Sequence, residues 1–334
     1  MASRRGGRRF ARPRGAGRGA FGRAFDTAFG GGGEDDEAGN ESEAGLERAR
    51  PEPADWMAEA EPEEPPPGPR RSDTLARVLW ALPWIVFAIT IVAVGGLLFA
   101  AAMVLFACAG MNEYFLMTKR ARPLAPVAYA AAGAIILVAH YQDQYEILML
   151  LLATLPALFV AALLRAERRN VAYSIAVTVF GLVWIVLPFS YAVLLRDLPL
   201  HAGALLIDVL VATFIADTAA YAGGRLFGRH TLAPTLSPNK TVEGLAFGFV
   251  GGMLAFWFAG LYQDWLPGLD ALAMGALIAA LAPAGDLFES MIKRDHENKD
   301  SGNFYGPHGG VLDRLDAVLF TVVAGYYLSV AFVY

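Results

Sequence analysis

Long apolar runs separated by short polar loops dominate the chain from about residue 78 onward. Between Arg77 and Glu113 lie 35 uncharged residues. As one helix they would extend ~52 Å, against a hydrocarbon core of ~30 Å. We therefore expect two spans there, with a break near Gly95 and Gly96. The further predicted spans cover residues 124–140, 146–164, 171–195, 202–222, 242–261, 270–289 and 313–333.

Composition agrees with this pattern. The 334 residues are 56% hydrophobic and only 18% charged, and the mean hydropathy is positive. Two soluble domains would contain more charge, so this class is disfavoured. The single cysteine, Cys108, excludes an internal disulfide framework. We predict an all-α, polytopic integral membrane protein with about nine transmembrane helices.

The positions of Lys and Arg predict its orientation, because cytoplasmic loops retain basic residues. Of the 27, 13 lie in the tail up to Arg77 and 13 more lie in alternate loops. Arg196 alone falls in the opposite set of loops. We therefore expect a cytoplasmic N-terminus, and we expect the polar loops near the C-terminal end of the chain to face the cytoplasm.

The chain divides by composition into residues 1–72, 73–199 and 200–334. The first region is Arg-rich up to Arg23 and then acidic and Pro-rich, so it cannot bury a core and is predicted to be a disordered cytoplasmic tail. A solvated tail is preferred to one that binds anionic lipid or RNA, so no specific nucleic acid is expected as a partner. No apolar segment follows the arginines closely enough for a signal peptide. The other two regions are predicted to be N-terminal transmembrane helices and a C-terminal transmembrane catalytic domain.

Charge is concentrated between the last two predicted spans. Residues 290–317 contain four fixed cations and five acids. Asp286 lies on one helical face with Lys293, and Asp313 shares a face with Asp316 at the start of the next span. Carboxylates at a membrane boundary, without an equal number of buried cations, need a neutralising partner. Oxygen ligands with open positions suit magnesium bound together with substrate phosphates, so we predict a metal site at Asp286 and Asp313.

The same segment has features that suit phosphate binding. Arg314 can hold a phosphate through two parallel hydrogen bonds. A Gly-rich loop before the last span can bring backbone N–H groups to an anion at a positive helix end. Each feature alone has an ordinary interpretation, as basic flanks, an acid–base pair or a loop histidine, but together they favour a reaction site. The residues are Lys293, Arg294, Lys299, Arg314, His308, Gly309 and Gly310.

A second polar segment follows the predicted span 202–222. Asp217 lies in the last turns of that span, and the loop after it contains Gly, Arg, Ser237 and Lys240. Its composition resembles a phosphate-binding loop, although neither GxxxxGK[ST] nor GxGxxG is present. Glu243 is interpreted as an acid in the first turn of the next helix. For Asp208 and Glu113, two readings stay open: a wall of the site, or a buried acid paired within the bundle.

Together the two segments resemble the CDP-diacylglycerol synthases, the phosphatidate cytidylyltransferases of the bacterial type. The segment SMIKRDHENKDSGNFYGPHGGVLDRLDA, residues 290–317, matches their signature nearly throughout. GDLFES at 285–290 and LSPNKTVEG at 236–244 also resemble family segments. The resemblance is specific over 200–334, loose over 78–199 and absent over the tail. It departs at residues 305–307, where the family usually has an aliphatic residue followed by Pro-Gly.

The resemblance implies cytidylyl transfer from CTP to phosphatidic acid at the inner or plasma membrane, giving CDP-diacylglycerol and pyrophosphate for phospholipid synthesis. It implies Mg²⁺ at Asp286 and Asp313, and it leaves a second cation and a homodimer open. The alternatives are a CTP-dependent lipid kinase of the polyprenol type and a transporter of anionic metabolites. The implied catalytic residues are Asp286, Lys293, Arg294, Asp313 and Arg314, and the implied substrate-binding residues are Asp217, Ser237, Lys240, Ser290, Lys299, Asp300, His308, Gly309, Gly310 and Asp316.

Overall fold

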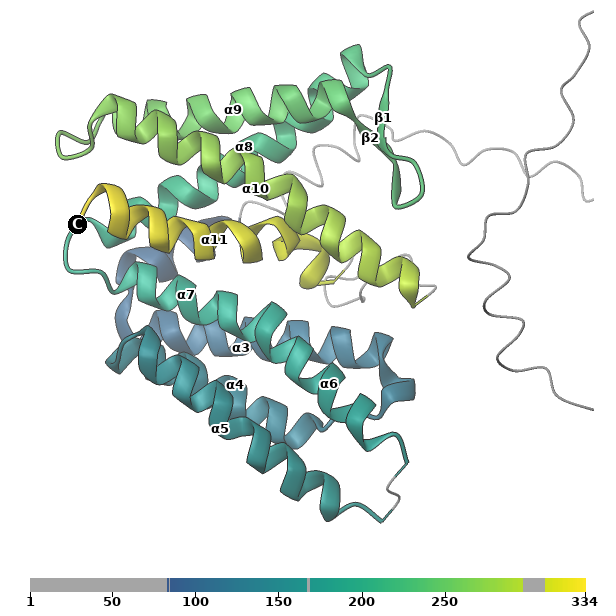
Figure 1. The fold of residues 1–334 in the computed structure, drawn as a ribbon. Helices are drawn as coiled ribbons and strands as arrows, with labels where there is room; N and C mark the ends of the chain where they lie inside the picture. Colours follow the sequence, from purple (N-terminus) through teal and green to yellow (C-terminus); the bar gives the residue numbers. More distant parts are fainter. Residues whose placement is uncertain (1–82, 84, 167–168, 297–309) are drawn as a thin grey trace, which may run out of the picture. The chain divides into compact units, whose positions relative to one another are not determined.

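A computed structural model describes residues 83, 85–166, 169–296 and 310–334. These residues belong to one compact unit, Pro69–Tyr334, which is built of helices and a single two-stranded sheet within the described ranges (Figure 1). In chain order the elements are the helix Ile85–Val94, α3 (Gly96–Met117), the short helix η2 (Lys119–Ala121), α4 (Ala125–Tyr141), α5 (Gln144–Leu163), α6 (Val171–Gly181), the π-helical turn η3 (Leu182–Val186), α7 (Leu187–Arg196), α8 (Ala202–Phe227), β1 (Thr231–Ala233), β2 (Ser237–Thr241), α9 (Val242–Gly260), α10 (Gly268–Asp295) and α11 (Leu312–Phe332).

The prediction of an all-α, polytopic membrane protein is confirmed. In the part of the chain that the structure describes, seven helices are long and apolar enough to cross a membrane. One of them is the continuous segment Val171–Arg196, which contains α6, η3 and α7. The first and third of the nine predicted segments form shorter apolar helices, Ile85–Val94 and Ala125–Tyr141. The count of nine and the side of the N-terminus therefore stay predictions.

The predicted break in the first apolar run lies at Gly95 and Gly96. Both glycines have positive φ, 66° and 57°, a backbone conformation that few other residues adopt without strain. The guanidinium group of Arg196 donates to the carbonyl oxygens of Val92 and Ala93, at 2.5 Å from Nε and 3.1 Å from Nη2. These carbonyls end a helix and have no helical partner of their own. Arg196, the one Arg or Lys outside the basic set of loops, therefore has a structural role: it caps the end of this helix.

Replacing Arg196 with Leu is expected to lower the stability of the protein. The two carbonyl groups would lose their donors at a partly buried helix end, which costs about 1–3 kcal/mol for a buried group left without a partner. Thermal unfolding of the purified protein in detergent measures the effect. The matched control is Arg120→Leu, because Arg120 is exposed. Equal melting temperatures for the two variants would contradict this role of Arg196.

Small residues bring α8 and α9 into close contact. A Cβ atom at Gly248 would lie 2.8 Å from the carbonyl oxygen of Ala216 and 2.8 Å from the Cβ of Ala220. Gly252, one turn later, faces Ala216 in the same way, at 2.9 Å. Such spacing is typical of membrane helices whose backbones approach each other. α9 also packs on α10, and α10 packs on α11. The hairpin β1–β2 therefore lies at the end of the bundle where α10 ends and α11 begins (Figure 1).

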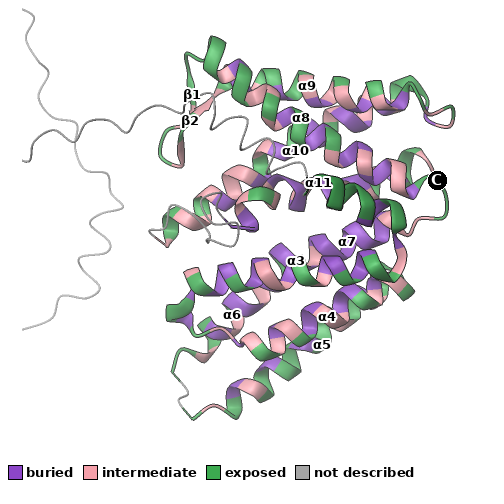
Figure 2. Cartoon of the chain, turned by 180° about the vertical axis from the view of Figure 1, so that it is seen from behind, coloured by how far each residue is buried: buried purple, intermediate pink, exposed green. Residues whose placement is uncertain are grey.

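The core of the unit lies around the segment Val171–Arg196. Of its most apolar stretch, 78% is buried inside the protein, compared with 22% for α5 and for α9. Figure 2 shows the buried positions facing the interior of the bundle. The same hydrophobic cluster includes residues of α3, α4, α7, α8, α10 and α11. The helices before and after residue 200 thus share one core, which fixes the last two helices against the first ones.

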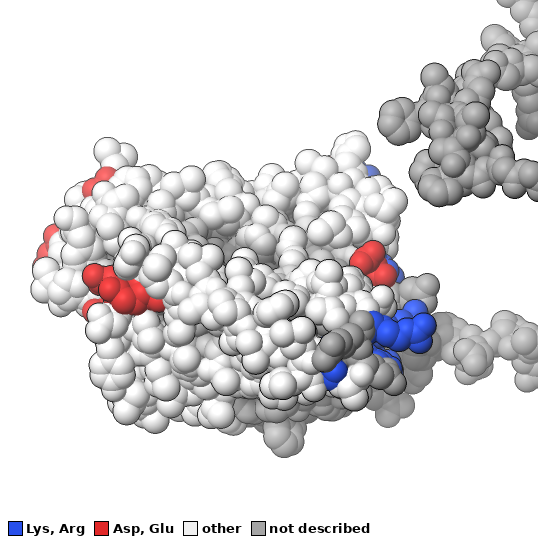
Figure 3. Space-filling view, turned by 60° about the horizontal axis from the view of Figure 1, so that its bottom comes forward, with Lys and Arg blue, Asp and Glu red and all other residues white. Residues whose placement is uncertain are grey.

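Charged side chains avoid the middle of the surface. On the face that Figure 3 shows, Asp and Glu gather at one end, Lys and Arg lie at the other end with further acids, and the surface between is uncharged. This distribution is expected for helices whose middle parts lie in lipid. The second end contains the hairpin and the C-terminal end of α10, so the described residues of the two polar segments lie at the same end of the bundle.

Candidate active site

The polar loop after α8 folds into an antiparallel hairpin. Strands β1 and β2 pair with Thr231 opposite Thr241 and Ala233 opposite Ser237. Thr241 also begins α9, because its hydroxyl accepts the N–H of Gly244 at 3.1 Å, as expected of an N-cap threonine. Sequence reasoning treated this segment as a loop, and its short, polar strands carry no alternating apolar pattern. The hairpin gives Lys240, its penultimate residue, a fixed position above α10.

Glu243 fastens the base of the hairpin. Its carboxylate accepts the backbone N–H groups of Arg229 and His230, at 3.0 and 3.2 Å, and lies 2.6 Å from Nδ1 of His230. The predicted placement in the first turn of a helix is confirmed. The structure adds that this acid ties the chain entering β1 to the helix that follows β2.

Helices α10 and α11 approach each other through Gly285. A Cβ atom at this position would lie 2.4 Å from the carbonyl oxygen of Asp316 and 3.0 Å from the Cα of Ala317. No side chain fits between the two backbones here. The contact places Asp286 and Glu289, the next acids of α10, beside the first turns of α11.

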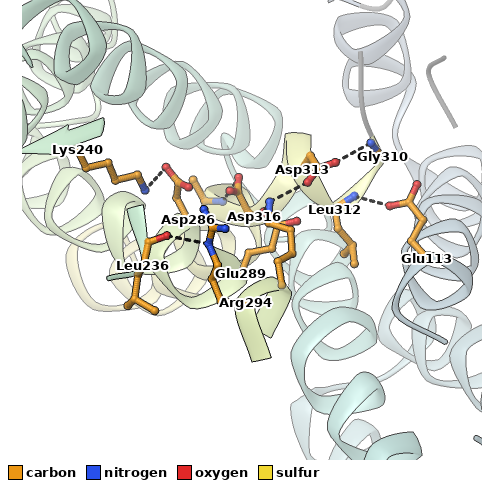
Figure 4. Close-up of polar contacts among 12 residues, drawn as sticks. Glu113, Leu236, Lys240, Asp286, Glu289, Arg294, Gly310, Leu312, Asp313 and Asp316 are labelled. Atoms are coloured by element: carbon orange, nitrogen blue, oxygen red, sulfur yellow. Dashed lines mark hydrogen bonds and ion pairs between the residues drawn. The ribbon is translucent and has the colours of Figure 1, made fainter. Parts of the chain in front are cut away.

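Each of the two aspartates nominated as metal ligands has a lysine partner. Lys240 of the hairpin forms an ion pair with Asp286 (Figure 4). Lys293 of α10 lies 2.8 Å from Oδ1 of Asp313. The hairpin and the last turn of α10 thus each supply one half-buried lysine, which the sequence did not pair with these acids.

Glu289 is a residue that the sequence-based list of site residues missed. It is 1% exposed, its Oε2 lies 3.2 Å from Nζ of Lys293, and its carboxyl group contacts that of Asp316. The other oxygen of Glu289, Oε1, has no hydrogen-bond partner among the described residues. Asp217 of α8 lies within electrostatic range of Asp286 and Lys240. The spacing of four between Glu289 and Lys293 signalled the pair, but a fully buried glutamate is too rare to expect from sequence.

The start of α11 is occupied by acids of the protein itself. The N–H of Gly310 donates to Oδ2 of Asp313 at 2.8 Å, and the N–H groups of Val311 and Leu312 donate to the carboxylate of Glu113 at 2.8 and 3.0 Å. Sequence reasoning nominated the N–H of Gly310 as a donor to substrate phosphate. In the structure Asp313 accepts this N–H, since a helix start offers its free N–H groups to the nearest anion. A role of Gly310 in binding substrate stays a prediction.

The other nominated residues fall into three groups. Arg294 and Arg314 are exposed, and Nε of Arg294 lies 3.4 Å from the carbonyl oxygen of Leu236 at the hairpin turn. Ser237 and Ser290 are half-buried, at the start of β2 and in the last turns of α10. Outside the described residues lie Lys299, Asp300, His308, Gly309 and the departure from the family pattern at 305–307.

The donor types of this site fit a magnesium ion. Its acids offer only oxygen ligands, which Mg²⁺ prefers, and the partnerless Oε1 of Glu289 leaves one buried carboxylate oxygen unused. Their arrangement does not amount to a metal cage. Within the described ranges, no three His, Cys, Asp or Glu residues are grouped so that they could hold an ion by themselves. Mg²⁺ commonly takes only one or two carboxylates from a protein and the rest of its ligands from phosphates and water.

Comparison with known proteins places this chain in a family. The chain is 36% identical over 151 residues to the phosphatidate cytidylyltransferase of Bacillus subtilis, a match covering 45% of this chain and 56% of that protein. It is 36% identical to the Pseudomonas aeruginosa phosphatidate cytidylyltransferase over 58% of this chain and 73% of that protein. With the Synechocystis phosphatidate cytidylyltransferase it is 32% identical over 76% of this chain and 96% of that protein.

The matched parts of this chain span about half the length of several curated relatives, among them the Bacillus protein at 56%. The family model described as the cytidylyltransferase family matches residues 75–332, which include every described element from the helix Ile85–Val94 to α11. The segments that the sequence singled out and the whole helical unit fall inside that match. The chain therefore belongs to the cytidylyltransferase family.

Proposed function

We propose that this protein transfers the cytidylyl group of CTP to phosphatidic acid. The observation that carries the proposal is the meeting of two acid–lysine pairs, Lys240–Asp286 and Lys293–Asp313, at one end of a membrane bundle. A lipid phosphate and a nucleotide triphosphate are both anions, and bringing them together requires fixed positive charge at the membrane surface. The relatives named as phosphatidate cytidylyltransferases support the choice of substrates.

In the proposed reaction a phosphate oxygen of phosphatidic acid attacks the α-phosphorus of CTP. A new P–O bond forms, the bond between the α-phosphorus and the bridging oxygen of the β-phosphate breaks, and pyrophosphate leaves with that electron pair. CDP-diacylglycerol stays in the membrane. The nucleophile already carries negative charge, so the reaction needs neither a covalent enzyme intermediate nor a general base. Catalysis then consists of alignment and charge neutralisation.

The side chains divide this work by their position. Lys240 and Lys293 are half-buried beside the acids and are proposed to bind triphosphate oxygens. Arg294 and Arg314 are exposed at the same end and are proposed to reach the phosphate of the lipid. Asp286 and Asp313 would hold Mg²⁺, which would supply charge neutralisation to the triphosphate when bound. This end of the bundle is proposed to face the cytoplasm, where CTP is available.

Two alternatives make different predictions. A lipid kinase would transfer the γ-phosphate of CTP to an alcohol. A transporter would place its polar residues near the middle of the bilayer, whereas the nominated acids and lysines lie at one end of the helices. The deciding experiment supplies the purified protein with Mg²⁺, phosphatidic acid and a total lipid extract, together with CTP labelled at either the α- or the γ-phosphate. Label from the α-phosphate in the lipid phase supports the proposal, whereas γ label supports a kinase. No lipid label from either substrate would count against both enzymes.

The Lys240–Asp286 pair allows a test of whether these residues act on substrate or only on each other. Lys240→Gln and Asp286→Asn are each expected to lower the transfer rate about 100-fold, the usual cost of one lost electrostatic contact to a transition state. The double variant is expected to be no better than either single variant. Initial rates on purified, monodisperse protein measure this. Recovery of activity in the double variant would show that the pair is only structural, because it removes the unpaired charge that each single change leaves behind.

A further inference from the structure

Glu113 joins the first described long helix to the start of the last one. It lies near the end of α3, is 4% exposed, and accepts the N–H groups of Val311 and Leu312, at 2.8 and 3.0 Å, through its two carboxylate oxygens. Figure 4 shows the contact with Leu312. Glu113 is 198 and 199 positions away from these two residues in the chain. Two buried N–H groups of a helix start are thereby satisfied by one side chain from outside the helix.

A second contact ties the same helices together. A Cβ atom at Gly110, one turn before Glu113, would lie 3.1 Å from Cδ2 of Leu312. The side chain of Leu312 therefore packs against α3 while its N–H group donates to Glu113 on the same helix. The first turn of α11 is held at two points, one polar and one apolar, on a single neighbour.

The turn that Glu113 holds carries Asp313. This aspartate follows Leu312 directly, and it accepts from Gly310 and pairs with Lys293. Lys293 in turn pairs with Glu289. A shift or rotation of the first turn of α11 would therefore move Asp313 away from Lys293 and change the acid–lysine arrangement at this end of the bundle.

We infer that Glu113 is a positioning residue for the transfer reaction: it fixes the first turn of α11 so that Asp313 keeps its place beside Lys293. This inference rests on the proposed function for its kinetic consequence. Its carboxylate also occupies the positive end of α11. This keeps substrate phosphate off the helix start and leaves phosphate binding to the lysines and arginines. Glu113 needs no contact with substrate for either effect.

The experiment compares Glu113→Gln with Asp208→Asn. Gln has the length of Glu but only one acceptor atom, and its amide group presents hydrogen atoms to the second backbone N–H. Asp208 is an acid equally buried at 4%, hydrogen-bonded by Gln263 at 2.7 Å and outside the proposed site. It therefore controls for the general cost of neutralising a buried acid. Both variants are purified as the full chain in detergent.

Two readouts are used. Hydrogen exchange followed by mass spectrometry is expected to be about 10-fold faster for peptides covering residues 310–313 in Glu113→Gln, and unchanged there in Asp208→Asn. Initial rates are expected to show kcat lowered 10- to 100-fold with the KM for CTP nearly unchanged, since a small misplacement of a reacting group lowers kcat strongly. If Glu113→Gln does not purify as a folded protein, Glu113→Asp replaces it, with the same expectation because its shorter side chain cannot reach both N–H groups.

The outcomes separate the two hypotheses. Exchange at 310–313 like that of the wild type, or a wild-type kcat, would overturn the inference about Glu113. Faster exchange spread over the whole chain, as from general destabilisation, would overturn it as well. A wild-type protein that transfers no α label from CTP to phosphatidic acid would overturn the proposed function instead. In that case the exchange data alone would still decide whether Glu113 holds the first turn of α11.

Discussion

Asp313→Asn is expected to lower cytidylyl transfer about 100- to 1,000-fold while the protein stays folded. Asp313 makes two contacts at the start of α11. Its Oδ1 pairs with Lys293 at 2.8 Å, and its Oδ2 accepts the backbone N–H of Gly310. Asn retains an oxygen acceptor for that N–H but loses the charge that faces Lys293. It also loses the carboxylate that the proposed function assigns to Mg²⁺. Initial rates with α-labelled CTP measure the change.

The matched control is Asp264→Asn. Asp264 is an exposed acid in the loop between α9 and α10, outside the proposed site, and its replacement is expected to leave the rate unchanged. Thermal unfolding of both variants separates loss of catalysis from loss of folding. Near-normal transfer by purified Asp313→Asn would remove this residue from the proposed chemistry and favour the interpretation that Asp313 only caps its own helix.

Gly285→Ala is expected to have an equally large effect through packing alone. The added methyl group would lie 2.4 Å from the carbonyl oxygen of Asp316, so α10 and α11 must move apart. Overpacking of this kind costs about 1–3 kcal/mol. The movement would also separate Asp286 and Glu289 from the first turns of α11, so transfer is expected to fall further than the loss of folded protein explains. The melting temperature measures the loss of stability, and the transfer rate per folded protein measures the effect of moving the acids away from α11.

Gly133→Ala provides the comparison for that variant. Gly133 lies in α4, and a Cβ atom there would meet nothing within 4 Å. Ala in a helix is about 0.5–1 kcal/mol more stable than Gly, so this variant is expected to be as stable as the wild type or slightly more so, and fully active. A Gly285→Ala protein with the melting temperature and rate of Gly133→Ala would show that the two helices can separate without consequence.

Much of the fold could be predicted from the sequence because lipid imposes simple rules. Apolar length defined all nine segments as helices, including the break at Gly95 and Gly96. These rules do not say what holds a helix end in place, because that depends on its neighbours. The helix Ile85–Val94 ends where the guanidinium group of Arg196 donates to its last carbonyl oxygens.

The site was harder to predict, because its pairs join segments far apart in the chain. Only the pair Glu289–Lys293 has a local signal, the spacing of four residues along one helix. Nothing local indicated that Lys240 would pair with Asp286, or that Glu113 would take two N–H groups of α11. These contacts follow from the packing of α9 on α10 and of the helices before residue 200 on those after it. Apart from Glu289, sequence therefore identified the acids and cations of the site, but not the partners that come from different segments of the chain.

The exposure of α9 has a consequence for the response to the surrounding lipid. Only 22% of its most apolar stretch is buried in the protein, and its first residue follows directly on the hairpin that carries Lys240. A change in the thickness of the bilayer relative to the hydrophobic length of α9 is accommodated by a change in the tilt of this helix. A tilt of α9 would be transmitted to the hairpin, whereas the central segment Val171–Arg196 has little contact with acyl chains. Membrane thickness would thus affect the position of Lys240 through the tilt of α9, the helix beside the site that is most exposed to lipid.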